Sequence, residues 1–85
     1  MKFHFATTFD SDYRSLPRRL QRTLEKKLEM LLGNPKHPSL HVKKMEGFDG
    51  IFEARFSKGY RFTFSKDESG YFIRRAGPHD VLKHP

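Results

Sequence analysis

The chain has 85 residues and no cysteine, and its 17 Lys and Arg against 10 Asp and Glu give a formal net charge of +7. The absence of cysteine excludes disulfide bonds and Cys-based metal sites, and the length predicts one domain over residues 1–85. Nine Phe and three Tyr argue against a disordered chain. No apolar run could span a membrane and no signal peptide is visible, so we expect a cytoplasmic protein with an anionic partner, either nucleic acid or an acidic protein.

The N-terminal third predicts a strand followed by a helical region. Residues 2–7 alternate aromatic and polar side chains, as in a half-buried strand. The Asp-Ser-Asp segment at 10–12 suits a helix N-terminus, Pro17 is tolerated in a first turn, and the Gly-Asn-Pro segment at 33–35 ends the helix. Leucines recur between them at helical spacing: Leu16, Leu20, Leu24, Leu28, Leu31 and Leu32. The region is either a helical hairpin or one bent helix.

The remaining residues predict a β-rich region. Strands are expected over residues 40–46, 51–56, 60–65 and 71–76. Ser57-Lys58-Gly59 is expected to form a three-residue hairpin loop, and Gly77-Pro78 to end the last strand before a short tail over 79–85. The predicted fold class is α+β: an N-terminal strand and a helical hairpin, or one bent helix, packed on a curved, twisted antiparallel sheet of four further strands.

The central hairpin carries the most informative pattern. With Phe56 opposite Tyr60, one face holds Phe52, Ala54, Phe62 and Phe64, which we assign to the core. The other face brings Arg55 opposite Arg61 and Glu53 opposite Thr63. Directly opposed like charges destabilise a sheet, so this face is either a solvated charged surface or a seat for phosphate.

Other basic residues extend the candidate phosphate seat. Either Arg74 or Arg75 reaches the same face, and Lys43-Lys44 and His79 flank it in the chain. A histidine at a strand end is more often solvated than catalytic. The basic helix, with Arg18 and Arg22, is either a solvated face or a source of non-specific attraction to phosphates. No metal-ligand spacing, nucleophile motif or phosphate loop is present, so we predict no metal and no cofactor.

An ordered set of short segments resembles the RelE/ParE toxin superfamily. The segments are Asn34 to Leu40, Lys43 to Gly47, Phe52-Glu53-Ala54-Arg55, Gly59-Tyr60-Arg61-Phe62 and Gly77-Pro78-His79-Asp80. The resemblance implies a small α+β fold and a toxin–antitoxin module with a cognate antitoxin as partner. It further implies either mRNA cleavage on the ribosome without metal, as in the RelE branch, or inhibition of DNA gyrase, as in the ParE branch.

The resemblance also implies roles for individual residues. Arg61 matches the arginine that family ribonucleases place against the scissile phosphate, and Arg55 falls where some members have a catalytic lysine. Lys43 falls where a related ribonuclease has a catalytic histidine, and His79 matches a histidine of the same branch. Glu53 falls where RelE has a basic residue, so its role as a base is our inference.

These residues lead to one main hypothesis and one alternative. The main hypothesis is an mRNA endonuclease in which Glu53 or Lys43 is the base, His79 the acid and Arg55 with Arg61 the charge clamp. RNA-binding residues are expected at Lys44, Arg74, Arg75, Arg18 and Arg22. The alternative is a ParE-like inhibitory binder or an inactive relic that binds antitoxin, and it is favoured by the tail, where residues 81–85 lack the functional Tyr or Phe of several members. A stand-alone RNA-binding domain has little support, because no stacking motif is visible.

Overall fold

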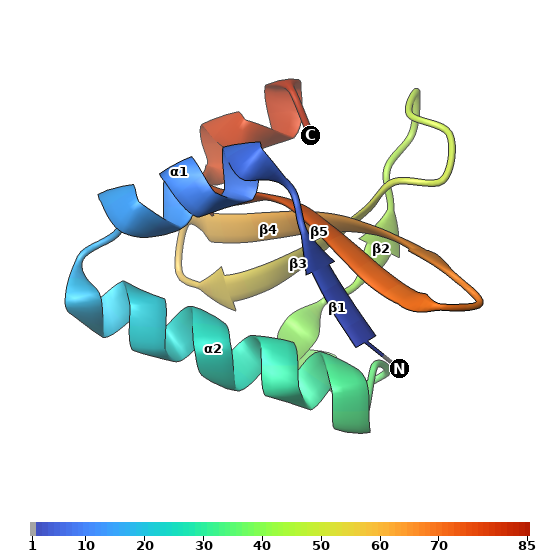
Figure 1. Ribbon diagram of the computed structural model, residues 1–85, viewed down its shortest axis with the longest axis horizontal. Helices are drawn as coiled ribbons and strands as arrows, with labels where there is room; N and C mark the ends of the chain where they lie inside the picture. Colours follow the sequence, from blue (N-terminus) through green and yellow to red (C-terminus); the bar gives the residue numbers. More distant parts are fainter. Residues whose placement is uncertain (1) are drawn as a thin grey trace.

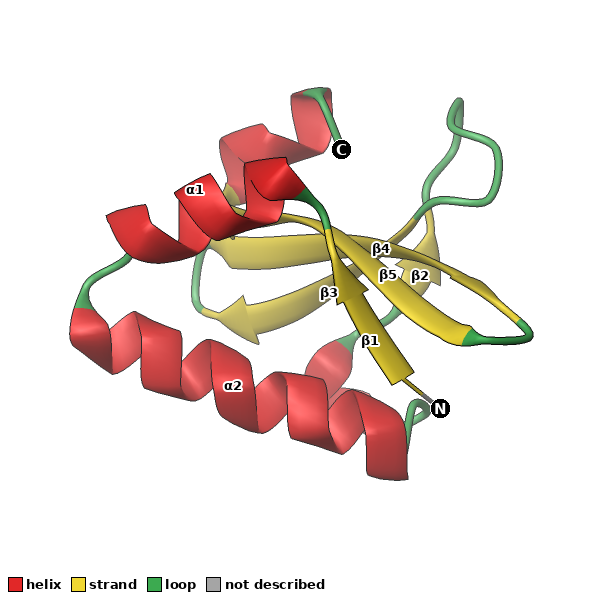
Figure 2. Ribbon diagram, viewed as in Figure 1, coloured by secondary structure: helices red, strands yellow, loops and turns green. Residues whose placement is uncertain are grey.

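The computed structural model describes residues 2–85, in which helices and strands are combined in an α+β fold. The elements are β1 (Lys2–Phe5), α1 (Thr7–Ser15), α2 (Arg18–Gly33), the 3-10 helix η1 (Pro38–Leu40), β2 (Lys43–Lys44), β3 (Phe52–Ser57), β4 (Tyr60–Asp67), β5 (Gly70–Pro78) and the 3-10 helix η2 (His79–Lys83). Figure 1 shows α2 lying along one side of the twisted sheet and η2 on the other side. Figure 2 shows that the strands form a single layer between these helices.

The sheet has five strands in the order β1-β5-β4-β3-β2. Strands β2 to β5 pair antiparallel, which confirms the predicted meander. The N-terminal strand joins the same sheet and runs parallel to β5, with Phe3 opposite Tyr71. This parallel pair joins the two ends of the chain, so no local sequence pattern indicates it.

The first helix begins earlier than the sequence pattern indicated. It starts at Thr7, so the predicted strand over residues 2–7 ends at Phe5, and the segment 10–12 lies inside α1 instead of capping it. Asp12 instead accepts hydrogen bonds from the backbone N–H of Ala76 at 3.0 Å and from Arg75 Nε at 2.7 Å. The bond to Ala76 gives a partner to a backbone N–H of β5 that lies beyond the end of β1, where no neighbouring strand can pair with it.

The helical region is a hairpin of two helices, which resolves the alternative left open by the sequence. The break falls at Leu16-Pro17, where both residues have extended backbone angles, and α2 ends at Gly33 as predicted. The buried leucines of α2 are Leu20, Leu24, Leu28 and Leu31. Leu32 was expected in this series but is 44% exposed. The buried leucines are spaced by four residues up to Leu28 and then by three to Leu31, which leaves Leu32 outside the buried face.

The predicted strand over residues 40–46 is wrong for most of its length. Leu40 belongs to η1, His41 has a left-handed backbone with φ of 47°, and only Lys43–Lys44 pairs with β3. The cause is local: His37 Nδ1 accepts from the backbone N–H of Ser39 at 3.1 Å and starts the 3-10 turn. Such side-chain-to-backbone bonds compete with strand formation.

The β3–β4 hairpin has the predicted register for four cross-strand pairs. Its turn is tighter than expected, because Ser57 rather than Phe56 pairs with Tyr60, and Gly59 takes a φ of +75°. Strand β5 also continues through Gly77 and Pro78 instead of ending there. Pro78 is tolerated because it lies beyond β1, where β5 is an edge strand.

Candidate functional site

The sheet face that points away from α2, here called the distal face, carries most of the predicted site residues. Successive side chains of a strand point to opposite faces, and Ala54, Phe62 and Phe64 are buried in the core. The intervening residues therefore lie on the distal face. Cross-strand pairing aligns them in two rows, Lys43–Glu53–Thr63–Arg75 and Arg55–Arg61–Gly77.

Four predicted residues form one group, here called the distal patch: Lys43, Glu53, Arg55 and Arg61. Directly opposed residues of antiparallel strands have Cβ atoms about 5 Å apart. Alternate residues along a strand are about 7 Å apart. The register therefore places both arginines, the lysine and the carboxylate close enough to act on one phosphate and its neighbouring ribose.

Burial within the distal patch is uneven. Glu53 is only 8% exposed, whereas Arg55 and Lys43 are exposed and Arg61 is half-buried. The face is therefore not the uniformly solvated surface that charge alone suggested. It has a sheltered carboxylate at its centre and cationic groups around it.

The two arginines of the distal patch keep most of their donors free. Within residues 2–85 the ion pairs join Asp12 to Arg75 and Asp80 to Lys83, so neither Arg55 nor Arg61 forms a direct ion pair with a carboxylate. Arg61 Nη1 donates to the carbonyl oxygen of Tyr60 at 2.9 Å, and Arg55 Nη1 lies 3.5 Å from His41 Nε2. Each guanidinium has five N–H donors, so several remain available for an anion.

His79 lies at the end of the sheet where the β3–β4 turn is found. Its backbone N–H donates to the carbonyl oxygen of Gly59 at 3.0 Å, and its side chain is exposed. The next turn of η2 packs on the distal face, because a Cβ on Gly77 would lie 2.9 Å from Val81 Cγ1. Gly77 thus allows η2 to approach closely and keeps His79 beside the row that contains Arg61.

The structure settles which of the two C-terminal arginines faces the distal side. Arg75 lies opposite Thr63 on that face, and Arg74 occupies the bulge between β4 and β5. The Asp12 hydrogen bond raises the pKa of Arg75, whose Nη1 also donates to the carbonyl oxygen of His84 at 3.0 Å. Arg74 Nε donates to the carbonyl oxygen of Pro85 at 3.1 Å. Both arginines therefore hold the C-terminal segment in place.

The other three predicted RNA-binding residues, like Arg74 and Arg75, lie outside the distal patch. Lys44 pairs with Phe52 and so projects toward the opposite face. Arg18 and Arg22 are exposed on α2, which Figure 1 shows on the other side of the sheet. Among residues 2–85 no three His, Cys, Asp or Glu side chains are grouped as metal ligands, and no helix is long and apolar enough to span a membrane.

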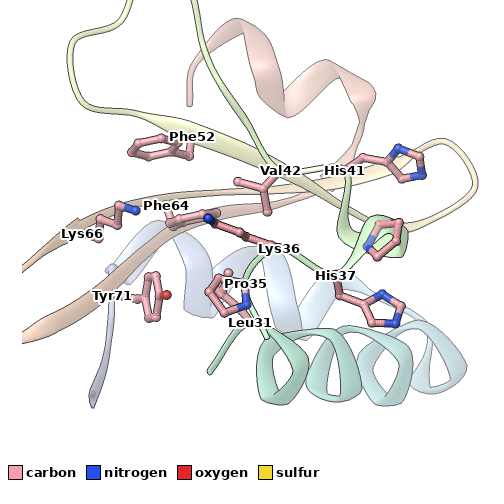
Figure 3. Close-up of a pocket in the computed structure, with 11 residues that line it drawn as sticks. Leu31, Pro35, Lys36, His37, His41, Val42, Phe52, Phe64, Lys66 and Tyr71 are labelled. Carbon is pink, nitrogen blue, oxygen red and sulfur yellow. The ribbon is translucent and has the colours of Figure 1, made fainter. Parts of the chain in front are cut away.

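An apolar pocket that the sequence did not indicate opens beside the C-terminal end of α2 (Figure 3). Its volume is about 460 Å³, and its lining comes from α2, the following loop and strands β3 to β5. Phe52, Phe64 and Tyr71 contribute aromatic rings, and Lys66 Nζ lies 5.1 Å from the centroid of the Phe52 ring. Lys36 and Lys66 are the charged residues of the lining. The pocket is therefore apolar inside and cationic at its rim, on the side of the sheet away from the distal patch.

Comparison with known proteins supports the fold assignment. No protein-family model and no curated protein matches the sequence. A solved RelB–RelE antitoxin–toxin complex from Methanococcus jannaschii matches at 19% identity with a TM-score of 0.75, over 96% of this chain and 99% of that chain. YafQ from E. coli strain BL21(DE3) matches at 14% identity with a TM-score of 0.79, over 95% and 96% of the two chains. The RelE–RelB complex from Pyrococcus horikoshii OT3 matches at 21% identity with a TM-score of 0.72, over 91% and 92%. The chain therefore has the fold of the RelE-like toxins, as the resemblance in its sequence implied.

Proposed function

We propose that this chain is the toxin of a toxin–antitoxin module and an endoribonuclease that cleaves mRNA on the ribosome without a metal ion. The observation that carries the proposal is the distal patch, where two arginines that form no ion pair and a sheltered glutamate share one face. The fold likeness to RelE and YafQ adds support.

The proposed reaction begins with removal of the ribose 2′-OH proton by Glu53 or Lys43. These two residues pair directly across β2 and β3, so either can approach the same hydroxyl. The 2′ oxygen then attacks phosphorus, the bond from phosphorus to the 5′ oxygen breaks, and His79 donates a proton to that leaving oxygen. The products are a 2′,3′-cyclic phosphate and a 5′-hydroxyl end.

Arg55 and Arg61 are assigned to the phosphate. They face each other across β3 and β4, where two like charges would destabilise the pair in the absence of an anion. A guanidinium binds two phosphate oxygens at once, and the pair would stabilise the negative charge that grows in the transition state. The repulsion between them is thereby offset when RNA is bound.

The other predicted basic residues are assigned weaker roles. We assign Lys44, Arg18 and Arg22, which lie outside the distal patch, to sequence-independent attraction toward RNA and the ribosome. Arg74 and Arg75 would act on RNA mainly by holding the C-terminal segment and η2 beside the patch.

A cognate antitoxin is the proposed protein partner. The net charge of +7 favours an acidic or amphipathic segment, and the matched structures from Methanococcus jannaschii and Pyrococcus horikoshii are antitoxin–toxin complexes. Copurification of the product of the neighbouring gene from the native operon tests this assignment. Recovery of the chain alone from an intact operon would contradict it.

One observation favours a second candidate function. Residues 81–85 contain no Tyr or Phe, and Val81 is buried against the sheet, so the tail lacks the phenyl or phenol ring on which a base would stack in several family members. This feature favours a ParE-like inhibitor of DNA gyrase or an inactive antitoxin-binding relic. Purified chain incubated with mRNA-programmed ribosomes, and in parallel with gyrase and relaxed plasmid, separates the functions. The main proposal predicts new RNA ends with a 5′-hydroxyl and unchanged supercoiling.

A further inference from the structure

A second cleft lies at the edge of β3, on the side where Arg55 is exposed. It has a volume of about 510 Å³ and is here called the edge cleft. Its lining residues are Lys27, Ser39, Arg55, Phe56, Ser57, Lys58 and Gly59. Strand β2 begins at Lys43, opposite Glu53, so no strand covers the edge of β3 at Arg55. The cleft therefore opens between α2, η1 and the β3–β4 turn.

The edge cleft has three cations and no carboxylate in its lining, contributed by Lys27, Arg55 and Lys58. Neither ion pair found within residues 2–85 involves any of them. Like charges gathered in one cleft repel each other unless an anion lies between them. The composition of the lining thus indicates an anionic ligand.

The donors of the edge cleft are positioned but largely unused. Lys27 Nζ donates to Ser39 Oγ at 2.9 Å, which fixes the ammonium group and leaves two of its N–H groups free. Ser39 Oγ is itself held 2.9 Å from His37 Nδ1. The long contact of Arg55 with His41 is the only hydrogen bond of that guanidinium within residues 2–85, and the Lys58 side chain has none there.

Arg55 connects the edge cleft with the distal patch. The β3–β4 register places it opposite Arg61, and it also lines the cleft. The turn at Lys58 and Gly59 closes the cleft, and the carbonyl oxygen of Gly59 accepts from the backbone N–H of His79. An RNA strand that crosses the edge of β3 would therefore present successive phosphates to the two sides of Arg55.

We propose that the edge cleft binds a second RNA phosphate, next to the phosphate held by Arg55 and Arg61. This inference rests on the proposed function, because it assigns the neighbouring phosphate of the same strand. The ligand is a phosphodiester of RNA, from either mRNA or ribosomal RNA. Lys27 and Lys58 contribute charge-assisted hydrogen bonds, and Arg55 is shared between the two phosphates.

The test compares two adjacent lysines that differ in position but not in charge. Lys27→Gln removes a cation from the edge cleft, and Lys26→Gln removes one from the exposed surface of the same helix. Binding is measured first to inorganic pyrophosphate by NMR titration, and then to a short RNA with 2′-deoxy substitutions that prevent cleavage. Loss of one charge-assisted hydrogen bond corresponds to about tenfold weaker binding. We expect that loss for Lys27→Gln and a change below about twofold for Lys26→Gln.

Lys58→Gln serves as a second variant, since Lys27 also connects α2 to η1 and its loss can affect folding. Lys58 is exposed in a turn, and the same weakening is expected there with unchanged thermal stability. Binding to ribosomes without mRNA distinguishes ribosomal RNA from mRNA as the source of the phosphate. Equal losses for Lys26→Gln and Lys27→Gln, or pyrophosphate shifts confined to the distal patch, would overturn the proposal. If the chain binds pyrophosphate in the edge cleft but has no ribonuclease activity, the anion site stands and the proposed function fails.

Discussion

Replacing Thr63 with valine is expected to stabilise the domain. Thr63 is fully buried at the centre of the sheet, and its Oγ1 atom has no hydrogen-bond partner within residues 2–85. A buried hydroxyl without a partner costs about 1–3 kcal/mol of desolvation. Valine has nearly the same shape, keeps the packing and removes that cost, so the free energy of unfolding should rise by about 1–2 kcal/mol.

The increase is large enough to measure by urea and thermal denaturation. For a domain of 85 residues, 1 kcal/mol corresponds to a Tm shift of about 4–8 °C, and the urea midpoint moves by roughly 1 M. Thr23→Val is the control, because Thr23 Oγ1 donates to the carbonyl oxygen of Arg19 at 3.0 Å and its loss should give no gain. Destabilisation of Thr63→Val by about 1 kcal/mol or more would show that the hydroxyl is hydrogen-bonded, and the reasoning would be refuted.

Three further predictions concern charged side chains. For Arg61→Ala, the plot of log affinity for single-stranded RNA against log salt should become less steep by about 0.7, with stability unchanged or improved, and an unchanged slope would remove Arg61 from the phosphate site. Asp12→Ala should lower the free energy of unfolding in urea by about 1–3 kcal/mol, because Ala76 N–H and the Arg75 guanidinium lose their acceptor. Hydrogen bonds from Ser69 lower the pKa of Asp67 below 3.8, so its carboxylate stabilises the fold above that pH and the contribution is lost as the pH falls further. Asp67→Asn should therefore reduce Tm more at pH 7 than at pH values well below 3.8, whereas an equal deficit at both would contradict the assignment.

The fold could be predicted where apolar residues alternate along a strand and also pair with apolar residues of the neighbouring strand. The hairpin register followed from the apolar pairs Ala54–Phe62 and Phe52–Phe64, because a one-residue slip would have exposed every ring. Two features could not be predicted from such patterns. The parallel pairing of β1 with β5 joins the chain ends, and Asp12 forms its hydrogen bonds with β5 instead of with its own helix terminus.

The candidate site was predictable as a face but not in detail. Alternation along β3 and β4 is enough to place Glu53, Arg55 and Arg61 on one side of the sheet. The bulge at Arg74 shifts the register of β5 by one residue, so the position of Arg75 required the structure. The edge cleft was not predicted, because α2, η1 and the β3–β4 turn come together only in the folded chain.

The most direct test of the proposed ribonuclease is to map mRNA ends in cells that express the chain without its antitoxin. Primer extension should reveal new 5′ ends in translated mRNA together with growth arrest for the unaltered chain. His79→Gln should lower cleavage by about 10²–10⁴-fold while ribosome binding persists, because glutamine retains hydrogen bonding but cannot deliver a proton. The matched control His84→Gln alters an exposed histidine in the tail and should cleave normally. Growth arrest by the unaltered chain without new RNA ends would contradict the account and favour the gyrase-type inhibitor.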